Sequence, residues 1–285
     1  MLANVSGAGL LPAGPTSTGQ VIEWLAELPI TGVSATPSYM RYLIETAQRQ
    51  GVDPGSWGLR RGFIGGEGAS IALRRQVCET LGEQFVWQEF YGSTETGGPV
   101  LGYSRPEAPL SGELLIDTRE FIVEILEPER DEPVTPGETG ELTVTAPFRE
   151  ATPLLRYRTR DLAAEIVDGR RHPSGLPRVT SILGRIDDAL KVRGALVYPS
   201  AIEEVVAGFC PPGAEWRIEV TREAGGMDVI TVRAELESEP AAVRLRQLLF
   251  DRLAVQPVVE GVPPGSLERF QGKASRVADS RPGVE

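Results

Sequence analysis

The pattern of apolar and polar positions over residues 20–104 predicts helices that alternate with short strands. Segments with helical spacing are 20–28, 39–50 and 70–81, and short apolar runs are 30–35, 59–64 and 84–89. The second helical segment follows Pro37, and proline is favoured at a helix start. Alternating strands and helices indicate a parallel α/β sheet whose loops gather at the carboxyl ends of the strands. We assign residues 1–104 to this α/β subdomain.

From residue 105 the pattern changes to short strands separated by turns rich in proline and glycine. The expected strands are 113–116, 121–126, 140–145, 162–166 and 179–183. The turn at 133–137 has the sequence Pro-Val-Thr-Pro-Gly, a composition typical of tight turns. We therefore expect residues 105–185 to form a second subdomain, a small antiparallel β-barrel or sheet.

Residues 186–285 have a third pattern, in which strands and helices are mixed. The expected strands are 190–192, 216–222, 229–236 and 258–262, and the expected helices are 199–208 and 239–253. This β-α-β-β-α-β order predicts a compact α+β domain. The polar segment 267–279 is expected to be a loop. The whole chain is therefore predicted to combine an α/β part with an α+β part.

The charge balance argues against several classes of partner. The 285 residues include 29 Lys and Arg against 40 Asp and Glu, a net charge of -11 at pH 7. Nucleic acid and anionic membrane surfaces both attract clustered positive charge, so we expect neither as a partner. No apolar run approaches the roughly 18 residues of a membrane span, and the N-terminus lacks the basic start of a signal peptide. We expect a cytoplasmic protein.

Cysteine and histidine narrow the possible chemistry further. Cys78 and Cys210 lie far apart without a CxxC motif, and we expect both to be small buried apolar side chains in a reducing compartment. His172 is the only histidine of the sequence and is expected to be solvated in a polar loop. A single histidine excludes mechanisms that need two, and most histidine-rich zinc sites.

The most densely charged turn of the sequence is GRIDDALKVRGALVYPSAIEE, which begins at Gly184. It places Asp187 beside Asp188 and brings Lys191 to the turn that follows. Charge of this density between two packed regions favours a joint whose faces change partners. The alternative is a rigid interdomain turn held by salt bridges.

A second polar segment, Tyr91-Gly92-Ser93-Thr94-Glu95, follows directly on an expected strand. Backbone N–H groups of such a turn can face an anion. Thr94 can donate a hydrogen bond to a phosphate oxygen, and Glu95 can hold a magnesium ion. Tyr91 can place its ring against a flat base. The alternative is a glycine-rich surface turn without a ligand.

A third polar segment is the run RYRTRD, which ends at Asp161. One carboxylate can accept hydrogen bonds from both hydroxyls of a ribose, so Asp161 is a candidate nucleotide ligand. The alternative is a turn-capping aspartate paired with Arg158 or Arg160.

These segments, in this order, resemble the adenylate-forming (AMP-forming) acyl-CoA ligases, and within them the phenylacetate-CoA ligase family. The resemblance implies catalytic roles for Thr94, at the α-phosphate, and for Glu95, as the magnesium ligand. It also implies that Tyr91, Gly92 and Ser93 line the nucleotide site.

The same resemblance implies roles for residues nearer the C-terminus. Asp161 is implied to bind the ribose, Arg185 the ribose or a phosphate, and Lys191 the nucleotide. Asp187 is implied to be the pivot about which a mobile C-terminal domain rotates. Lys273, which alone would be taken for a surface lysine, is implied to be the catalytic lysine that stabilises charge as pyrophosphate leaves.

The resemblance extends to an acyl pocket. Tyr39 stands in a TPSY segment, and Gly65, Gly66 and Glu67 form a segment that in the family borders the acid, as does Tyr91. Small glycines would leave room for a flat ring, and Tyr39 could stack on it. The alternative is ordinary packing between strands and helices.

The implied cofactors are ATP or AMP, Mg²⁺ and CoA, and the implied substrate is a small aromatic carboxylic acid of the phenylacetate or benzoate kind. The family's phosphate-binding loop should lie far upstream of the TPSY segment, but only 35 residues precede Thr36. We therefore expect a partial α/β subdomain at the N-terminus. The chain is a ligase, or an adenylate-binding module that needs a second copy or a complementing N-terminal chain. An amine or a carrier protein as acceptor stays open.

Overall fold

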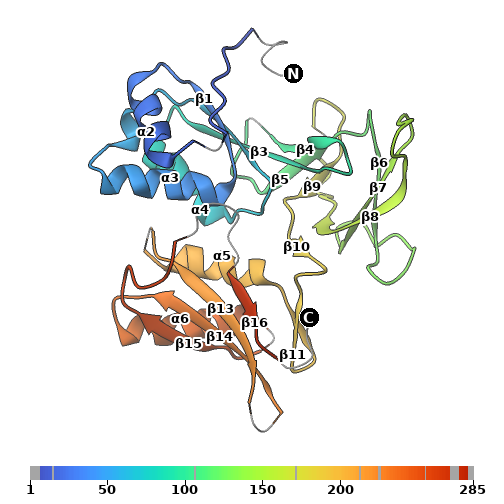
Figure 1. Ribbon diagram of the computed structural model, residues 1–285. Coiled ribbons are helices and arrows are strands. Elements are labelled where there is room, and N and C mark those ends of the chain that lie inside the picture. The colour runs from blue at the N-terminus through green and yellow to red at the C-terminus, as the bar shows by residue number, and fades with distance from the viewer. Residues whose placement is uncertain are drawn as a thin grey trace.

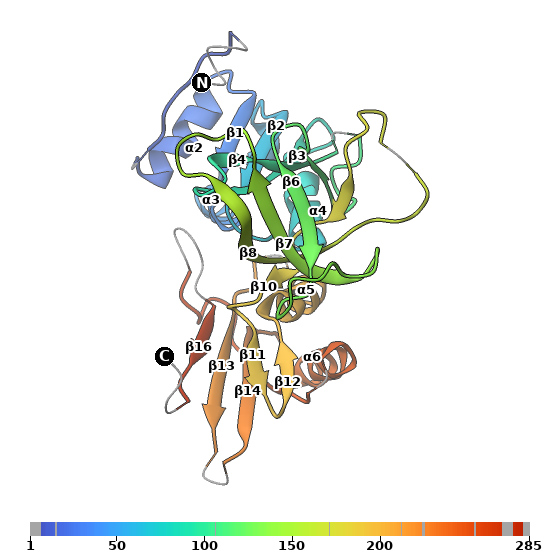
Figure 2. The same ribbon diagram turned by 90° about the vertical axis from the view of Figure 1, so that its right-hand side faces the viewer.

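The computed structural model describes residues 7–14, 16–105, 107–170, 172–211, 213–223, 226–253, 255–269 and 276–281, without the side chains of 99 and 100 (Figures 1 and 2). In Figure 1 the elements up to β9 lie above, and the elements from α5 onward lie below. Helix α5 (Pro199–Phe209) of the lower unit contacts α4 (Ile71–Leu81) of the upper unit.

The upper unit is built on one mixed sheet in the order β1-β2-β3-β4-β5-β9. Its strands are β1 (Gly32–Ala35), β2 (Arg61–Gly65), β3 (Val86–Ser93), β4 (Gly98–Ser104), β5 (Glu113–Ile116) and β9 (Arg178–Thr180). The first three strands are parallel, as the alternating pattern predicts, and the remaining pairs are antiparallel. β5 and β9, from the segment expected to form a second subdomain, hydrogen-bond within this first sheet.

Helices α2 (Thr18–Glu27), α3 (Pro37–Arg49) and α4 pack with β1–β3 around one apolar core, near the short 3₁₀ turn η1 (Pro54–Ser56). Each helix begins after a hydroxyl side chain that accepts a backbone N–H of its first turn. The caps are Ser17, Thr36 and Ser70. This core buries Met40 and Trp87 completely and so fixes the strand ends that carry the polar segments.

A second sheet has the order β10-β8-β7-β6. Its strands are β6 (Ile122–Leu126), β7 (Thr139–Ala146), β8 (Leu154–Ala164) and β10 (Gly184–Arg185). Over the described residues this sheet stays open, so the barrel expected as one of two alternatives is wrong and the antiparallel sheet is confirmed. Four strands are too few to close around a filled interior. The sheet instead buries Leu142 and Val144 against Leu114 and Ile116 of β5.

The lower unit contains a four-stranded sheet in the order β15-β14-β13-β16, with β13 (Trp216–Arg222), β14 (Asp228–Glu235), β15 (Val258–Val262) and β16 (Val277–Asp279). Helices α5 and α6 (Glu239–Arg252) share its core. The α+β character is confirmed. Two details differ from expectation, because 277–279 forms an edge strand rather than a loop, and the expected first strand lies outside this sheet.

That first strand, β11 (Leu190–Val192), pairs instead with β12 (Ala195–Val197). Arg193 and Gly194 connect the two strands with φ angles of 50° and 81°. Two successive residues in the left-handed region make the tight turn whose twist matches a hairpin. The strand therefore closes locally on its neighbour.

The cysteines and the histidine lie in surroundings partly different from those expected. Cys78 and Cys210 are free thiols and half-buried. The side chain of His172 is 15% exposed, and its Nε2 lies 3.0 Å from Glu107 Oε1. The loop therefore shields this histidine rather than leaving it solvated. None of the helices among the described residues is long and apolar enough to cross a membrane.

Candidate functional site

A large cavity of about 1670 Å³ opens between the upper and lower units. Of the residues selected from the sequence, it is lined by Gly66, Glu67, Tyr91, Gly92, Ser93, Asp161, Arg185, Asp187 and Lys191. Tyr39, Gly65, Thr94 and Glu95 are not among its lining residues, and Lys273 lies outside the described residues. The structure thus brings together side chains that are 100 residues apart in the sequence, such as Tyr91 and Lys191.

Asp161 stands at the centre of this arrangement and is 8% exposed. Its Oδ2 accepts a hydrogen bond of 2.6 Å from the Tyr91 hydroxyl, and its Oδ1 accepts one of 3.2 Å from Arg185 Nη1. The contact with Arg185 follows from the register, since β10 pairs Arg185 with Asp161 of β8. Two oxygens with about four acceptor positions can take further donors from a ligand.

The alternative partners for Asp161 bind elsewhere. Arg158 forms an ion pair of 2.7 Å with the buried Glu141, and Arg160 forms one of 3.0 Å with Asp187. Arg160 also has a φ of 67° and donates its N–H to Glu141 Oε1 at 2.9 Å. The pairing of β8 with β7 shifts at this point. This β-bulge accompanies the turn of Asp161 toward the cavity.

Burial controls the ionisation of these two side chains. It raises the pKa of Asp161, and the hydrogen bond from Tyr91 and the charge of Arg185 offset only part of that effect. Burial, followed by the charge of Asp161, raises the pKa of Tyr91. The phenol therefore stays protonated at neutral pH and acts as a hydrogen-bond donor.

The turn after β3 carries Thr94 and Glu95 on the exposed surface. Gly97 closes it with a φ of 85° and donates its N–H to the Thr94 carbonyl at 3.0 Å. Hydrogen bonds from its own backbone N–H and from Ser93 lower the pKa of Glu95. No group of three or more potential metal ligands occurs among the described residues. One ionised carboxylate fits Mg²⁺, which binds one or two protein carboxylates together with substrate phosphates.

The segment expected to border the acid has two environments. A Cβ on Gly65 would lie 2.5 Å from the ring of Phe90, so that ring fills the space beside this glycine. Glu67 faces the cavity and accepts the Ser38 N–H at 2.9 Å. Tyr39 is half-buried and packs against the core of the upper unit.

The joint itself is polar and exposed. Asp187 is half-exposed and forms ion pairs with two arginines. The distance to Arg160 is 3.0 Å, and the distance to Arg185 is 3.8 Å. Gly184 precedes it, where a Cβ would lie 3.0 Å from Ser200 Oγ. Lys191 is exposed on the hairpin that follows.

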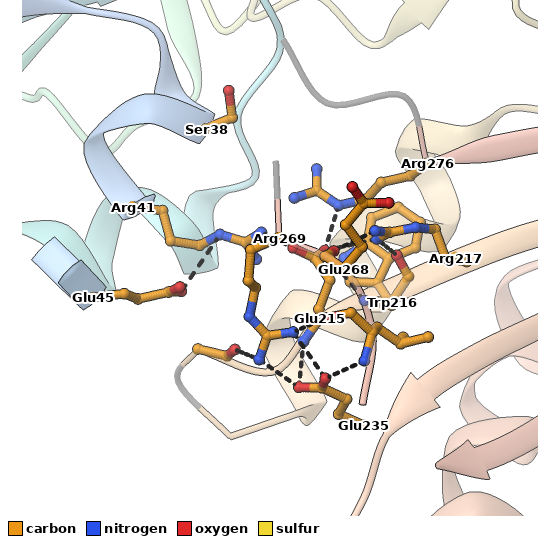
Figure 3. Close-up of polar contacts among 12 residues, drawn as sticks. Ser38, Arg41, Glu45, Glu215, Trp216, Arg217, Glu235, Glu268, Arg269 and Arg276 are labelled. Atoms are coloured by element: carbon orange, nitrogen blue, oxygen red, sulfur yellow. Dashed lines mark hydrogen bonds and ion pairs between the residues drawn. The ribbon is translucent and has the colours of Figure 1, made fainter. Parts of the chain in front are cut away.

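Sequence reasoning missed a second polar cluster at the boundary between the two units, which we call the boundary cluster: Arg41, Glu215, Trp216, Arg217, Glu235, Arg269 and Arg276 (Figure 3). Arg41 of α3 meets Glu215, the residue directly before β13, at 2.6 Å although 174 positions separate them in the sequence. The buried Glu215 is an isolated carboxylate at the junction between a loop and β13, so no local motif signals it.

Comparisons with known proteins agree with this architecture. The AMP-binding enzyme family model matches residues 1–149, more than half of the chain, and the AMP-binding enzyme C-terminal domain matches residues 194–281. Phenylacetate-coenzyme A ligase of Pseudomonas putida is 32% identical over 96% of this chain and 63% of its own length. The chain thus spans less than two thirds of that relative.

Solved structures of 2-hydroxyisobutyryl-CoA ligase match in two states. The postadenylation state, in complex with an acyl-AMP, is 25% identical with a TM-score of 0.81 and covers 95% of this chain and 58% of that chain. The thioesterification state is 26% identical with a TM-score of 0.56 over 96% of this chain and 58% of that chain. The family models show that this chain belongs to the AMP-binding, adenylate-forming ligases, and its identity to the Pseudomonas putida relative shows that it is a phenylacetate-CoA ligase-like member of them.

Proposed function

We propose that this chain acts in the AMP-forming activation of a carboxylic acid as an acyl-adenylate and in the transfer of the acyl group to CoA. The observation that carries the proposal is the buried Asp161, held between Tyr91 and Arg185 on the wall of the cavity. A buried carboxylate with remaining acceptor positions is suited to the two hydroxyls of a ribose. The name of the Pseudomonas putida relative supports phenylacetate or a similar aromatic acid as the substrate.

The residues around Asp161 can serve the rest of the nucleotide. Gly92 and Ser93 line the cavity beside it and present backbone to the α-phosphate. Thr94 follows on the exposed turn and supplies a hydroxyl donor. Arg185, beside Asp161, and Lys191, on the hairpin that follows, supply positive charge to the cavity.

Glu95 would hold Mg²⁺ together with phosphate oxygens of the nucleotide. When bound, the ion would neutralise charge on the phosphates during adenylation. The lowered pKa of Glu95 keeps its carboxylate ionised and available for that role. Among the acyl-pocket candidates, Glu67 and Gly66 line the cavity and Tyr91 bounds it, so these three would face the acid.

We propose that residues 186–285 rotate as a unit about Asp187 and that Lys273 serves the adenylation step. The higher TM-score against a postadenylation state than against a thioesterification state supports two arrangements of the same parts. The exposed ion pairs of Asp187 with Arg160 and Arg185 can exchange partners at little cost, because surface pairs contribute about 0–1 kcal/mol.

The proposal is tested by pyrophosphate exchange with a panel of aryl and alkyl acids, alongside calorimetric titration of the chain with AMP. Exchange with phenylacetate, lost in Lys273→Ala, is the expected result. AMP binding without exchange for any acid would support the adenylate-binding module instead. Absence of both would refute the proposal.

A second candidate, a module that works with a second copy or a complementing chain, is favoured by one surface feature. Phe63 is 45% exposed on β2, although β2 lies between β1 and β3. Parallel strands are ordinarily covered on both faces, so this face is suited to a polypeptide partner. Light scattering that shows a monodisperse monomer, together with exchange activity, would contradict this candidate. Assays with amines and carrier proteins distinguish the acceptors.

A further inference from the structure

The boundary cluster contains one carboxylate that is shared between the two units. Glu215, 1% exposed, stands immediately before β13. Its Oε2 accepts a hydrogen bond of 2.6 Å from Arg41 Nη2 of α3 in the upper unit. Its Oε1 accepts one of 2.8 Å from Arg276 Nε in the lower unit (Figure 3). Glu215 is therefore a single anion that two units use at once.

Arg276 is fixed by more than this ion pair. Its guanidinium lies over the Trp216 ring at 5.1 Å, a cation–π distance. Its carbonyl accepts the Ile218 N–H at 2.7 Å, at the point where β16 starts to pair with β13. Arg276 thus anchors the chain directly after residues 270–275.

Arg269 provides a matching anchor directly before residues 270–275. It donates to both carboxylate oxygens of Glu235, at 2.8 Å and 2.7 Å. Glu235 Oε2 also accepts the Glu215 N–H at 3.2 Å, and the Glu235 N–H donates to the Glu215 carbonyl at 3.0 Å. Glu215 and Glu235 are therefore hydrogen-bonded to each other through the Glu215 backbone, and Lys273 lies between their arginines in the sequence.

The charges favour an ionised Glu215. Burial would raise its pKa, but Arg41 and Arg276 outweigh that effect, and the pKa of Glu215 is lowered. Removing Arg41 would leave a buried carboxylate with fewer positive partners, which is costly. Among the described contacts of Glu215, the partner from the upper unit is Arg41. Separation of the two units would therefore break the ion pair between Arg41 and Glu215.

From this geometry we infer that Arg41 and Glu215 are positioning residues for adenylation. Their ion pair holds the lower unit against α3 and, through Arg276, couples this docking to the position of β16, which follows Lys273 in the sequence. The inference rests on the proposed function for its catalytic consequence. Its structural consequence is that docking of the lower unit on α3 is coupled to the position of Arg276 and β16. This coupling can be tested without any enzymatic activity.

The structural test compares Arg41→Ala with Arg49→Ala in the 285-residue chain. Arg49 is an exposed arginine of the same helix whose guanidinium contacts Thr46, so it is a matched control. Arg41→Ala should speed amide hydrogen exchange in peptides covering 213–217 and 276–281 by about tenfold or more, and should increase the radius of gyration in X-ray scattering. Arg49→Ala should match the parent chain.

Arg41→Lys separates a loss of positioning from a loss of folding. It keeps one positive charge and should restore part of the protection, whereas a merely unfolded Arg41→Ala would show exchange throughout 18–93 and a changed circular dichroism spectrum. Unchanged exchange and scattering in Arg41→Ala would overturn the inference. Such a negative result would leave the proposed function standing, because hydrogen exchange and scattering are measured here without a substrate.

The kinetic test separates the two half-reactions with any acid that supports exchange. Arg41→Ala should lower pyrophosphate exchange by about tenfold or more, as expected for loss of one partner of a desolvated charge pair. Thioester formation from added acyl-adenylate should stay within about twofold. An equal fall in both half-reactions would contradict a role specific to adenylation.

Discussion

Arg74 of α4 and Glu89 of β3, the strand that also carries Tyr91, form a buried ion pair. Arg74 is 1% exposed, and its Nη1 lies 2.5 Å from Glu89 Oε2. Arg74 Nη2 also donates to Glu89 Oε1 at 2.9 Å and to Ser181 Oγ at 3.2 Å, while Nε donates to the Ala69 carbonyl at 3.1 Å. The pair therefore joins α4, β3 and the segment after β9.

Replacing Arg74 by methionine keeps an unbranched side chain but leaves the Glu89 carboxylate without its main positive partner. Removal of one partner from a buried pair typically costs about 3–5 kcal/mol. We expect a loss of this size for Arg74→Met in urea unfolding at pH 7, followed by the fluorescence of the buried Trp87. Arg75→Met, at the exposed neighbouring position, should change stability by less than about 0.5 kcal/mol.

The double variant Arg74→Met with Glu89→Leu provides the sharper comparison. Apolar replacement of both partners is often neutral or stabilising, so the double variant should recover most of the loss. Burial already raises the pKa of Glu89, and loss of Arg74 should raise it further. A raised carboxyl pKa means that the destabilisation of Arg74→Met diminishes as pH falls below that pKa. A double variant no more stable than the single, or a loss without pH dependence, would refute the electrostatic explanation.

Three further predictions concern packing, ligand binding and pH. Gly65→Ala should cost about 1–3 kcal/mol in urea unfolding, because its Cβ has no space, whereas Gly68→Ala, with nothing within 4 Å, should be neutral. Asp161→Asn should weaken AMP binding about 10- to 100-fold in calorimetry, and unchanged affinity would exclude the ribose role. Although burial opposes it, hydrogen bonds from Arg269 and backbone N–H groups lower the pKa of Glu235 to about 2. A carboxyl pKa that is lowered by folding stabilises the folded state above about pH 4.3, and this contribution is lost as the pH falls toward 2. Acid titration should therefore destabilise the parent chain more than the Glu235→Gln variant.

Much of the fold could be predicted from local patterns. The helices at 18–27, 37–49 and 71–81 appear within a few residues of their apolar-periodic segments, because each has a hydroxyl cap and a single apolar face. β5 and β13 match their expected bounds. Local periodicity did not predict strands whose formation depends on pairing with a distant part of the chain. β16 is a short strand in a polar context, and its pairing depends on Ile218, far away in the sequence.

The candidate site was predictable only in the part that we propose to face the nucleotide. The segments around Tyr91 and Asp161 can each be recognised from their local sequence, and in the structure a hydrogen bond joins Tyr91 to Asp161. The contact of Arg41 with Glu215 could not be foreseen, because each residue is ordinary in its local context and the pairing exists only once the two units meet. The crowding of Gly65 by Phe90 depends likewise on the register between β2 and β3.

The strand order β1-β2-β3-β4-β5-β9 has a consequence for dividing or recombining ligases of this kind. A fragment ending at residue 104 would lose β5 and β9 and leave β4 as an unpaired edge, open to association with other chains. A junction near Asp187 instead interrupts no strand longer than the two-residue β10. Exchange of whole C-terminal units at that point should therefore preserve every ladder of the upper sheet. The contacts that must then be matched across the hybrid include the ion pair between Arg41 and Glu215 and the packing of α5 on α4.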